Sequence, residues 1–308
     1  MFRSYSPPGQ PARRCGYLWN SGIDFSLCLQ CRSQTKVYGT RYGIKVVTAT
    51  HSDALDQRKC GNFMSKNRIN LYKYAAPANF YPLAGKLIPL FAVPSAILFI
   101  LGMYVGFFVA PTDAVQGESY RILFIHVPAA WMGMFLYVLM AIYAGVGWAF
   151  NARLASMMAT AISPTGAIFT FISLVTGSLW GRPAWGVWWV WDARLTSTLI
   201  LLFLYIGFIS LQSSIDDARR ADRAGAVLAL VGVINVPIIY FSVQWWNSLH
   251  QGATITKNSF KMAPSMAAAM LILLGACWLY SIAVVLVRVR YIIREREQEA
   301  PWLAEATA

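Results

Sequence analysis

The stretch that decides the fold class is Trp180–Ser197, WGRPAWGVWWVWDARLTS, which joins two strongly apolar runs. Five tryptophans fall within its first twelve residues, and Asp192 and Arg194 follow them. The apolar runs on either side are long enough to be membrane helices. The stretch is therefore predicted to be a connection at a membrane surface, which we term the WWD loop, residues 180–197.

The composition of the whole chain supports a membrane protein. The chain has 308 residues, of which 57% are hydrophobic and 13% are charged, whereas a soluble domain carries about a quarter charged residues. A membrane helix needs about 20 apolar residues, and six runs meet this length. They are Leu87–Val109, Ile122–Phe150, Met157–Leu179, Leu195–Ile215, Ala224–Trp246 and Met266–Val287. The predicted fold is an all-α integral membrane protein with six transmembrane helices.

The first 63 residues differ from the rest, because they are polar and carry nine basic and three acidic side chains. No apolar stretch of signal-peptide type follows their basic start. Cys28 and Cys31 form a CxxC that Arg32 follows, so it is not the c-type haem attachment pattern. We expect residues 1–63 to be a disordered leader or an extension upstream of the natural start at Met64. The membrane domain is then 64–296, and 297–308 form a cytoplasmic tail.

The basic residues predict the orientation of the helices. Twelve fall in one set of segments: Lys66, Arg68, Lys73, Lys86, Arg153, Arg219, Arg220, Arg223, Arg288, Arg290, Arg294 and Arg296. Five fall in the other: Arg121, Arg182, Arg194, Lys257 and Lys261. The richer side is expected to face the cytoplasm, with both termini there. The WWD loop then faces outward, to the periplasm in a bacterium.

Several function classes lack their motifs in this sequence. There is no P-loop, no HExxH, no GxSxG and no acidic pair within an apolar run. The chain also has no nucleic-acid-binding motif, and its basic residues are explained by membrane orientation. ATP hydrolysis through a Walker motif is thus excluded, and the usual hydrolase and proton-pump signatures are missing.

Two of the three histidines are predicted to lie at the outer face, beside the WWD loop. His126 is near the start of the second apolar run, His250 comes just after the fifth, and His51 is in the leader. An ionisable residue within a membrane segment is a functional candidate. The alternative is an interfacial side chain that bonds a neighbour.

The five tryptophans of the WWD loop are Trp180, Trp185, Trp188, Trp189 and Trp191. Tryptophans commonly form a belt at membrane interfaces, but a belt spreads over many helix ends. The clustering here favours a folded platform for a large flat ligand, with Gly181, Pro183 and Gly186 providing bends and close backbone approach.

Haem fits this combination of residues. Imidazole nitrogens bind haem iron, which makes His126 and His250 the candidate axial ligands. Indole faces pack on flat rings, and Arg121, Arg182 and Arg194 are candidates for pairing with the propionates. Asp192 is expected either to pair with Arg194 or to organise the loop through hydrogen bonds.

The WWD loop also closely resembles the WWD signature of haem-handling proteins in cytochrome c biogenesis. With its six helices, single WWD loop and two flanking histidines, the chain from Met64 to Arg296 resembles the CcmC family of system I, the haem exporter proteins C. The resemblance implies a protein of the bacterial inner membrane that holds haem b at the periplasmic face. It also implies delivery of haem to the chaperone CcmE within a complex of CcmA, CcmB and CcmD. It makes His126 and His250 the axial pair and Trp180–Asp192, Arg121 and Arg194 the surrounding site.

Two alternatives remain open. The first is a haem lyase that attaches haem to apocytochrome c, although such relatives carry more helices and a further histidine pair. The second is a permease subunit of an ABC transporter in which the tryptophans are structural. Whether the protein itself promotes a covalent haem bond is also open from the sequence.

Overall fold

The computed structural model describes residues 71–307 apart from 247–249, 251–254, 257–258 and 261. The predicted leader, residues 1–63, lies outside the described residues. The described part belongs to one compact unit, Ile69–Ala308, and its regular elements are helices apart from two strands of two residues each.

Six helices or helix pairs are long and apolar enough to cross a membrane. They are α2 (Pro77–Tyr104) with the π-helix η2 (Val105–Val109), the 3₁₀ turn η3 (Glu118–Ile122) with α3 (Leu123–Phe150), α4 (Arg153–Trp185), α5 (Ala193–Ser214), α6 (Ala218–Gly232) with α7 (Asn235–Trp245), and α8 (Pro264–Arg296). The smaller elements are η1 (Leu71–Ala75), α9 (Pro301–Thr307) and the antiparallel pair β1 (Ile255–Thr256) and β2 (Ser259–Phe260). The prediction of an all-α membrane protein with six spans is confirmed.

Four spans begin or end well outside their predicted apolar runs, and one of them is the fifth, in which α6 begins at Ala218 rather than at Ala224. α2 begins at Pro77 rather than at the predicted Leu87, because a proline at the first helical position is pre-set for a helix. The exposed Lys86 ends the apolar run without ending this helix. α4 likewise extends past both ends of its predicted range. α8 continues beyond Val287 to Arg296, since arginine is a good helix former and its charge is favourable at a helix C-terminus.

The fifth span is broken, although the sequence predicted one continuous helix. α6 ends at Gly232 and α7 begins at Asn235. Pro237 lies just beyond the break, and a proline ring clashes with the carbonyl four residues earlier, here that of Val233. The break therefore falls where the proline requires it.

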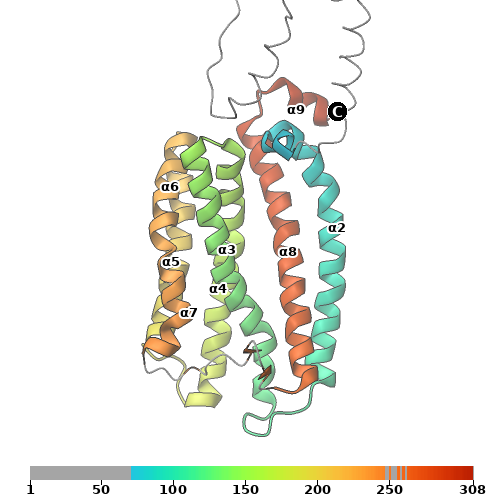
Figure 1. Ribbon diagram of the computed structural model, residues 1–308, viewed down its shortest axis with the longest axis vertical. Helices are drawn as coiled ribbons and strands as arrows, with labels where there is room; N and C mark the ends of the chain where they lie inside the picture. The colour runs from blue at the N-terminus through green and yellow to red at the C-terminus, as the bar shows by residue number, and fades with distance from the viewer. Residues whose placement is uncertain (1–70, 247–249, 251–254, 257–258, 261, 308) are drawn as a thin grey trace, which may run out of the picture. The chain divides into compact units, whose positions relative to one another are not determined.

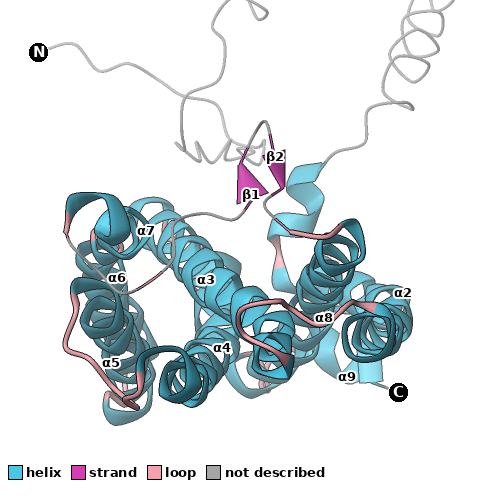
Figure 2. Ribbon diagram, turned by 90° about the horizontal axis from the view of Figure 1, so that it is seen from below, coloured by secondary structure: helices cyan, strands magenta, loops and turns pink. Residues whose placement is uncertain are grey.

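The helices are arranged as a central pair with a group on each side (Figures 1 and 2). α3 and α4 pack against each other along their length and are joined by a tight turn at Asn151, which takes the left-handed conformation. α5, α6 and α7 pack on one side of this pair, and α8 packs on the other side. α2 packs mainly against α8 and is the span least buried by the rest of the described protein.

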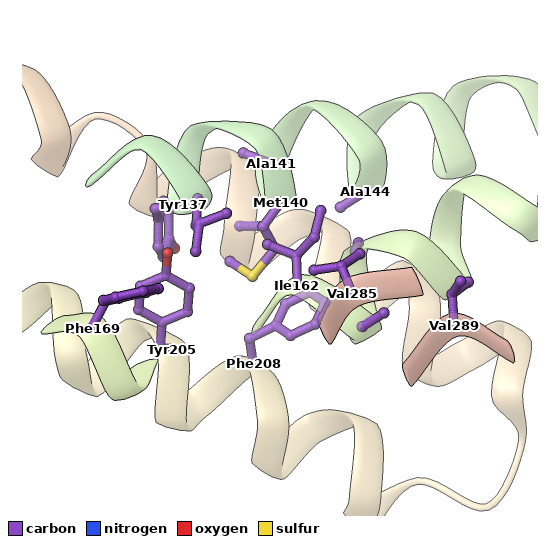
Figure 3. Packing of buried hydrophobic residues seen from close by; sticks show 14 of the residues in the cluster. Tyr137, Met140, Ala141, Ala144, Ile162, Phe169, Tyr205, Phe208, Val285 and Val289 are labelled. Carbon is purple, nitrogen blue, oxygen red and sulfur yellow. The ribbon is translucent and has the colours of Figure 1, made fainter. Parts of the chain in front are cut away.

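The main core lies between α3, α4 and α5 and extends to α6 and α8 (Figure 3). Tyr137 and Tyr205 are fully buried and meet edge to face, with ring centroids 4.9 Å apart. The Tyr205 hydroxyl donates to the Gly133 carbonyl over 2.8 Å. A Cβ on Gly166 would lie 2.1 Å from that hydroxyl, so the close approach of α4 to α5 requires glycine there.

A second apolar cluster fixes the start of α3, the helix that carries His126. Tyr120 and Phe124 are buried against Met270 and Leu273 of α8. The Tyr120 hydroxyl donates to the Pro111 carbonyl over 2.7 Å, which ties the segment after η2 to η3. This end of α3 is therefore anchored from two sides.

Candidate functional site

The WWD loop is shorter than the sequence predicted. Trp180 and Trp185 belong to the last turns of α4, and the connection proper runs from Gly186, with φ of +80°, to Asp192. The predicted bends at Gly181 and Pro183 are wrong, because both residues are helical, and a proline can be tolerated within a membrane helix. A Cβ on Gly181 would lie 3.1 Å from the Val187 carbonyl, so this glycine does permit close backbone approach.

Hydrogen bonds fold the connection back onto α4. The Ser178 hydroxyl donates to the Trp188 carbonyl over 2.8 Å. Arg182 donates to the Gly186 carbonyl, and its guanidinium lies 6.0 Å from the centroid of the Trp188 ring. Arg182, a candidate for pairing with propionates, is thus already used to hold the connection.

His126 lies in the first turn of α3 and contacts α4. Its Nδ1 is 3.1 Å from the Thr176 Oγ1, and that hydroxyl in turn donates to the Ile172 carbonyl over 2.6 Å. Because the threonine proton is committed to the carbonyl, the oxygen accepts from the imidazole. The proton of a neutral His126 is thereby assigned to Nδ1, which leaves the lone pair on Nε2.

His250 follows α7 and contacts the start of α5. Its Nδ1 is 3.1 Å from the Asp192 Oδ2, and the side chains of the two residues are 13% and 7% exposed. Asp192 is also the N-cap of α5, since its Oδ1 accepts from the Leu195 backbone N–H over 2.8 Å. A carboxylate can only accept, so this contact too assigns the imidazole proton to Nδ1.

Burial lowers the pKa of His250 below its ordinary value of 6.5. The hydrogen bond and the charge of Asp192 act in the opposite direction, while the charge of Arg194 adds to the lowering. The net direction favours a neutral imidazole at neutral pH, which is the form that binds metal.

Two tryptophans at the end of α4 flank the two histidines. The Trp180 ring lies 6.0 Å from the His126 ring, and the Trp185 ring lies 4.8 Å from the His250 ring in an edge contact. The Trp180 indole N–H donates to the Gln116 side chain over 2.8 Å. One helix therefore supports both imidazoles.

Two of the other three tryptophans are more accessible. Trp188 and Trp191 are 55% and 75% exposed. Trp189 contacts Trp191 edge to face at 5.4 Å, and its buried indole N–H has no hydrogen-bond partner among the described residues. These rings give the connection an outward aromatic surface.

The remaining predicted arginines differ in their surroundings. Arg121 is 15% exposed, pairs with Glu118 and donates to the Gly106 carbonyl over 2.6 Å, so it joins η3 to η2. Arg194 is half-buried in the first turn of α5, and its guanidinium forms no hydrogen bond or ion pair with another described side chain. Arg194 is thus the better-placed cation for an incoming anionic group.

An open pocket of 360 Å³ lies beside Trp180. Arg121 and Glu118 line one wall, and Leu179, Trp180 and Pro183 of α4 line the other. The pocket adjoins the Trp180 side of the site and does not include either histidine.

Sequence reasoning missed the partners that orient the histidines. Thr176 is 50 positions from His126, and Asp192 is 58 positions from His250, so no local pattern links either pair. The Glu118–Arg121 pair has the i,i+3 spacing of helical neighbours, and this signal was present in the sequence.

The family model described as Heme exporter protein C matches residues 70–304 of this chain. A protein named Heme exporter protein C from Escherichia coli is 46% identical over 235 residues, which cover 76% of this chain and 95% of that protein. Its namesake from Haemophilus influenzae is 44% identical over 238 residues, with the same coverage. The namesake from Bradyrhizobium diazoefficiens is 48% identical over 189 residues, which cover 61% of this chain and 72% of that protein.

Proposed function

This chain belongs to the haem exporter protein C family, and we propose that it binds haem b as cargo, with His126 and His250 as axial ligands. In this proposal the protein delivers the haem to the chaperone CcmE for cytochrome c maturation. It does so within a complex that includes CcmA, CcmB and CcmD. The family name supports haem handling, and the assignment of ligands and partners is the proposal.

The observation that carries the proposal is the matched pair of imidazoles. Each ring has its Nδ1 beside an acceptor, Thr176 for His126 and Asp192 for His250. Histidine ligands of metals typically donate the other ring N–H to such a partner, which fixes the tautomer and the ring orientation. Both rings are therefore prepared to offer Nε2 to an iron whose remaining ligands come from a porphyrin.

The surroundings of the pair also suit haem. Trp180 and Trp185 hold apolar ring surface against the imidazoles, and aromatic faces pack favourably on a flat macrocycle. Arg194 is the candidate for a propionate, because a guanidinium pairs with a carboxylate through two parallel hydrogen bonds. Arg121 and Arg182 would act indirectly, by holding η3 and the connection in place.

The exposed tryptophans support an encounter with a partner protein at the same face. Trp188 and Trp191 present rigid aromatic surface beyond the half-buried pair, and aromatic side chains are enriched in protein interfaces. We assign this face to CcmE and to the periplasmic side of the bacterial inner membrane. The positive-inside rule supports the side, since arginines gather at the opposite ends of the helices.

The test is the visible absorption spectrum of the purified protein. A low-spin, bis-histidine spectrum is expected for the unaltered chain. His126→Ala and His250→Ala should each give a partly high-spin spectrum, with low spin restored by added imidazole. An unchanged low-spin spectrum in both variants would refute the ligand assignment. Absence of haem from the unaltered chain would instead favour a permease subunit, and transfer of haem to apocytochrome c would favour a lyase.

A further inference from the structure

A second pocket lies at the opposite end of α3 from His126. Its volume is 240 Å³, and it is formed where α3 ends, α4 begins and α6 begins. The lining residues are Gly147, Trp148, Asn151, Arg153, Ser156, Arg219, Asp222 and Arg223. Because these helix ends are the ends of three membrane spans, the pocket lies at the level of a membrane surface.

The pocket has an excess of positive charge. Three arginines and one aspartate line it, and Asp222 already accepts from Arg296 of α8 over 2.9 Å. Arg153 pairs with Glu297 but keeps 64% of its side chain exposed. Arg219 and Arg223 are exposed and form no ion pair with any described residue. Within the described residues, the Arg219 and Arg223 guanidinium groups are therefore not engaged in ion pairs and are available to a ligand.

The donors suit a phosphate group. Arginine offers a planar fork that matches phosphate oxygens, and here two such forks stand one helical turn apart on α6. The Asn151 amide and the Ser156 hydroxyl add uncharged donors at the ends of α3 and α4. A phosphate in this pocket could thus be contacted from three helices.

An exposed apolar ridge continues from the arginines along α6. Val227 and Val231 follow Arg223 at intervals of four residues and are 49% and 64% exposed. Side chains four residues apart form a continuous ridge on a helix. One ridge of α6 therefore has arginines at its start and valines along the rest. Trp148 is 50% exposed at the rim of the pocket, where tryptophan is favoured at a membrane interface.

We propose that this pocket binds the headgroup of an anionic phospholipid, whose acyl chain lies along the Val227–Val231 ridge of α6. Basic pockets between membrane helices are known to bind such headgroups. The ridge distinguishes a lipid from free phosphate, because a soluble anion would gain nothing from an apolar surface beyond the arginines. The site is separate from the histidine pair and does not depend on the proposed function.

The test compares phospholipids on the full-length protein in mild detergent, by native mass spectrometry. Phosphatidylglycerol should be retained in preference to phosphatidylcholine. Arg219→Gln combined with Arg223→Gln should weaken phosphatidylglycerol binding roughly 30-fold, from the attraction expected of two arginines. The matched control combines Arg220→Gln with Arg294→Gln, which removes the same charge from exposed positions outside the pocket and should change binding less than about twofold.

Four outcomes would overturn the proposal. Equal weakening in both double variants would show attraction to net charge rather than a pocket. Displacement of phosphatidylglycerol by millimolar inorganic phosphate would show a soluble-anion site, and capture of an acidic protein segment in place of lipid would show a protein interface. The lipid preference of the unaltered protein tests the proposal even if a variant fails to fold, since equal retention of the two lipids would contradict it.

Discussion

Replacing Asp192 with asparagine should separate the two roles of this side chain. One carboxylate oxygen accepts from the Leu195 N–H at the start of α5, and the other faces the Nδ1 of His250. An asparagine offers one oxygen and one NH₂ group in the same space. It can therefore keep one of these two hydrogen bonds but not both.

If the amide oxygen caps α5, its NH₂ group faces the Nδ1–H of His250. Two donors cannot bond, so the imidazole proton must move to Nε2, and the lone pair that would bind iron is lost. Removal of such a partner typically weakens metal binding ten- to 100-fold. The stability of α5 should be nearly unchanged, because asparagine and aspartate are equally good N-caps.

The assay is retention of haem during purification, followed by titration of haem into the stripped protein and by a thermal unfolding midpoint. Asp192→Asn should lower the affinity for haem with little change in the unfolding midpoint. Asp192→Ala should lower both the affinity and the midpoint, because the cap of α5 contributes about 1 kcal/mol to stability. Asp217→Asn is the matched control, since Asp217 caps α6 through the Arg220 N–H over 2.7 Å, at the other end of the helices. Unaltered haem affinity in Asp192→Asn would refute the tautomer argument.

Three further outcomes follow from the same geometry. Thr176→Val should weaken haem binding through His126 by about ten- to 100-fold, while Thr176→Ser should restore it, because serine keeps the hydroxyl acceptor; equal titrations in the two variants would contradict this. Trp185→Ala should remove about 1 kcal/mol of contact with the His250 ring and reduce haem retention. Trp191→Ala is the comparison, because its side chain is 75% exposed, and it should change the unfolding midpoint little. The stability gained from a neutral His250 should be fully present above pH 6.5 and lost as the pH falls through its lowered pKa, because the unfolded chain takes up the proton first. The unfolding midpoint should therefore fall less steeply from pH 8 to pH 5 in His250→Gln than in the unaltered protein. Parallel curves for the two proteins would show that His250 does not contribute to the pH dependence of stability.

The six membrane spans could be predicted from the sequence because their signal is local. Each apolar run is longer than a bilayer requires, and no tertiary contact is needed to find it. The ends were less certain for the same reason. Lys86 and Arg288 bound the apolar runs of α2 and α8 but lie inside the helices, because a charged side chain ends an apolar run without ending the helical backbone.

The sequence offered candidate site residues but not the contacts that hold them. The tryptophans and histidines led to the prediction of a flat ligand with a metal, and this remains a prediction. The contacts that orient the imidazoles join α3 to α4 and the segment after α7 to α5, so they depend on how the helices pack. Arg121 and Arg182 were predicted to bind propionates because they are positively charged. The structure shows that Arg121 instead pairs with Glu118 and that Arg182 donates to the Gly186 carbonyl.

The support that α4 gives to both histidines limits how this segment can change in length. Trp180 and Trp185 are five residues apart, which places them about 140° apart around the helix and about 7.5 Å apart along it. Inserting or deleting one residue between them would turn Trp185 by about 100° and carry its ring away from His250. The four intervening positions can therefore vary in residue type more readily than in number. Homologous chains are expected to keep this spacing even where they replace Pro183 or Ala184.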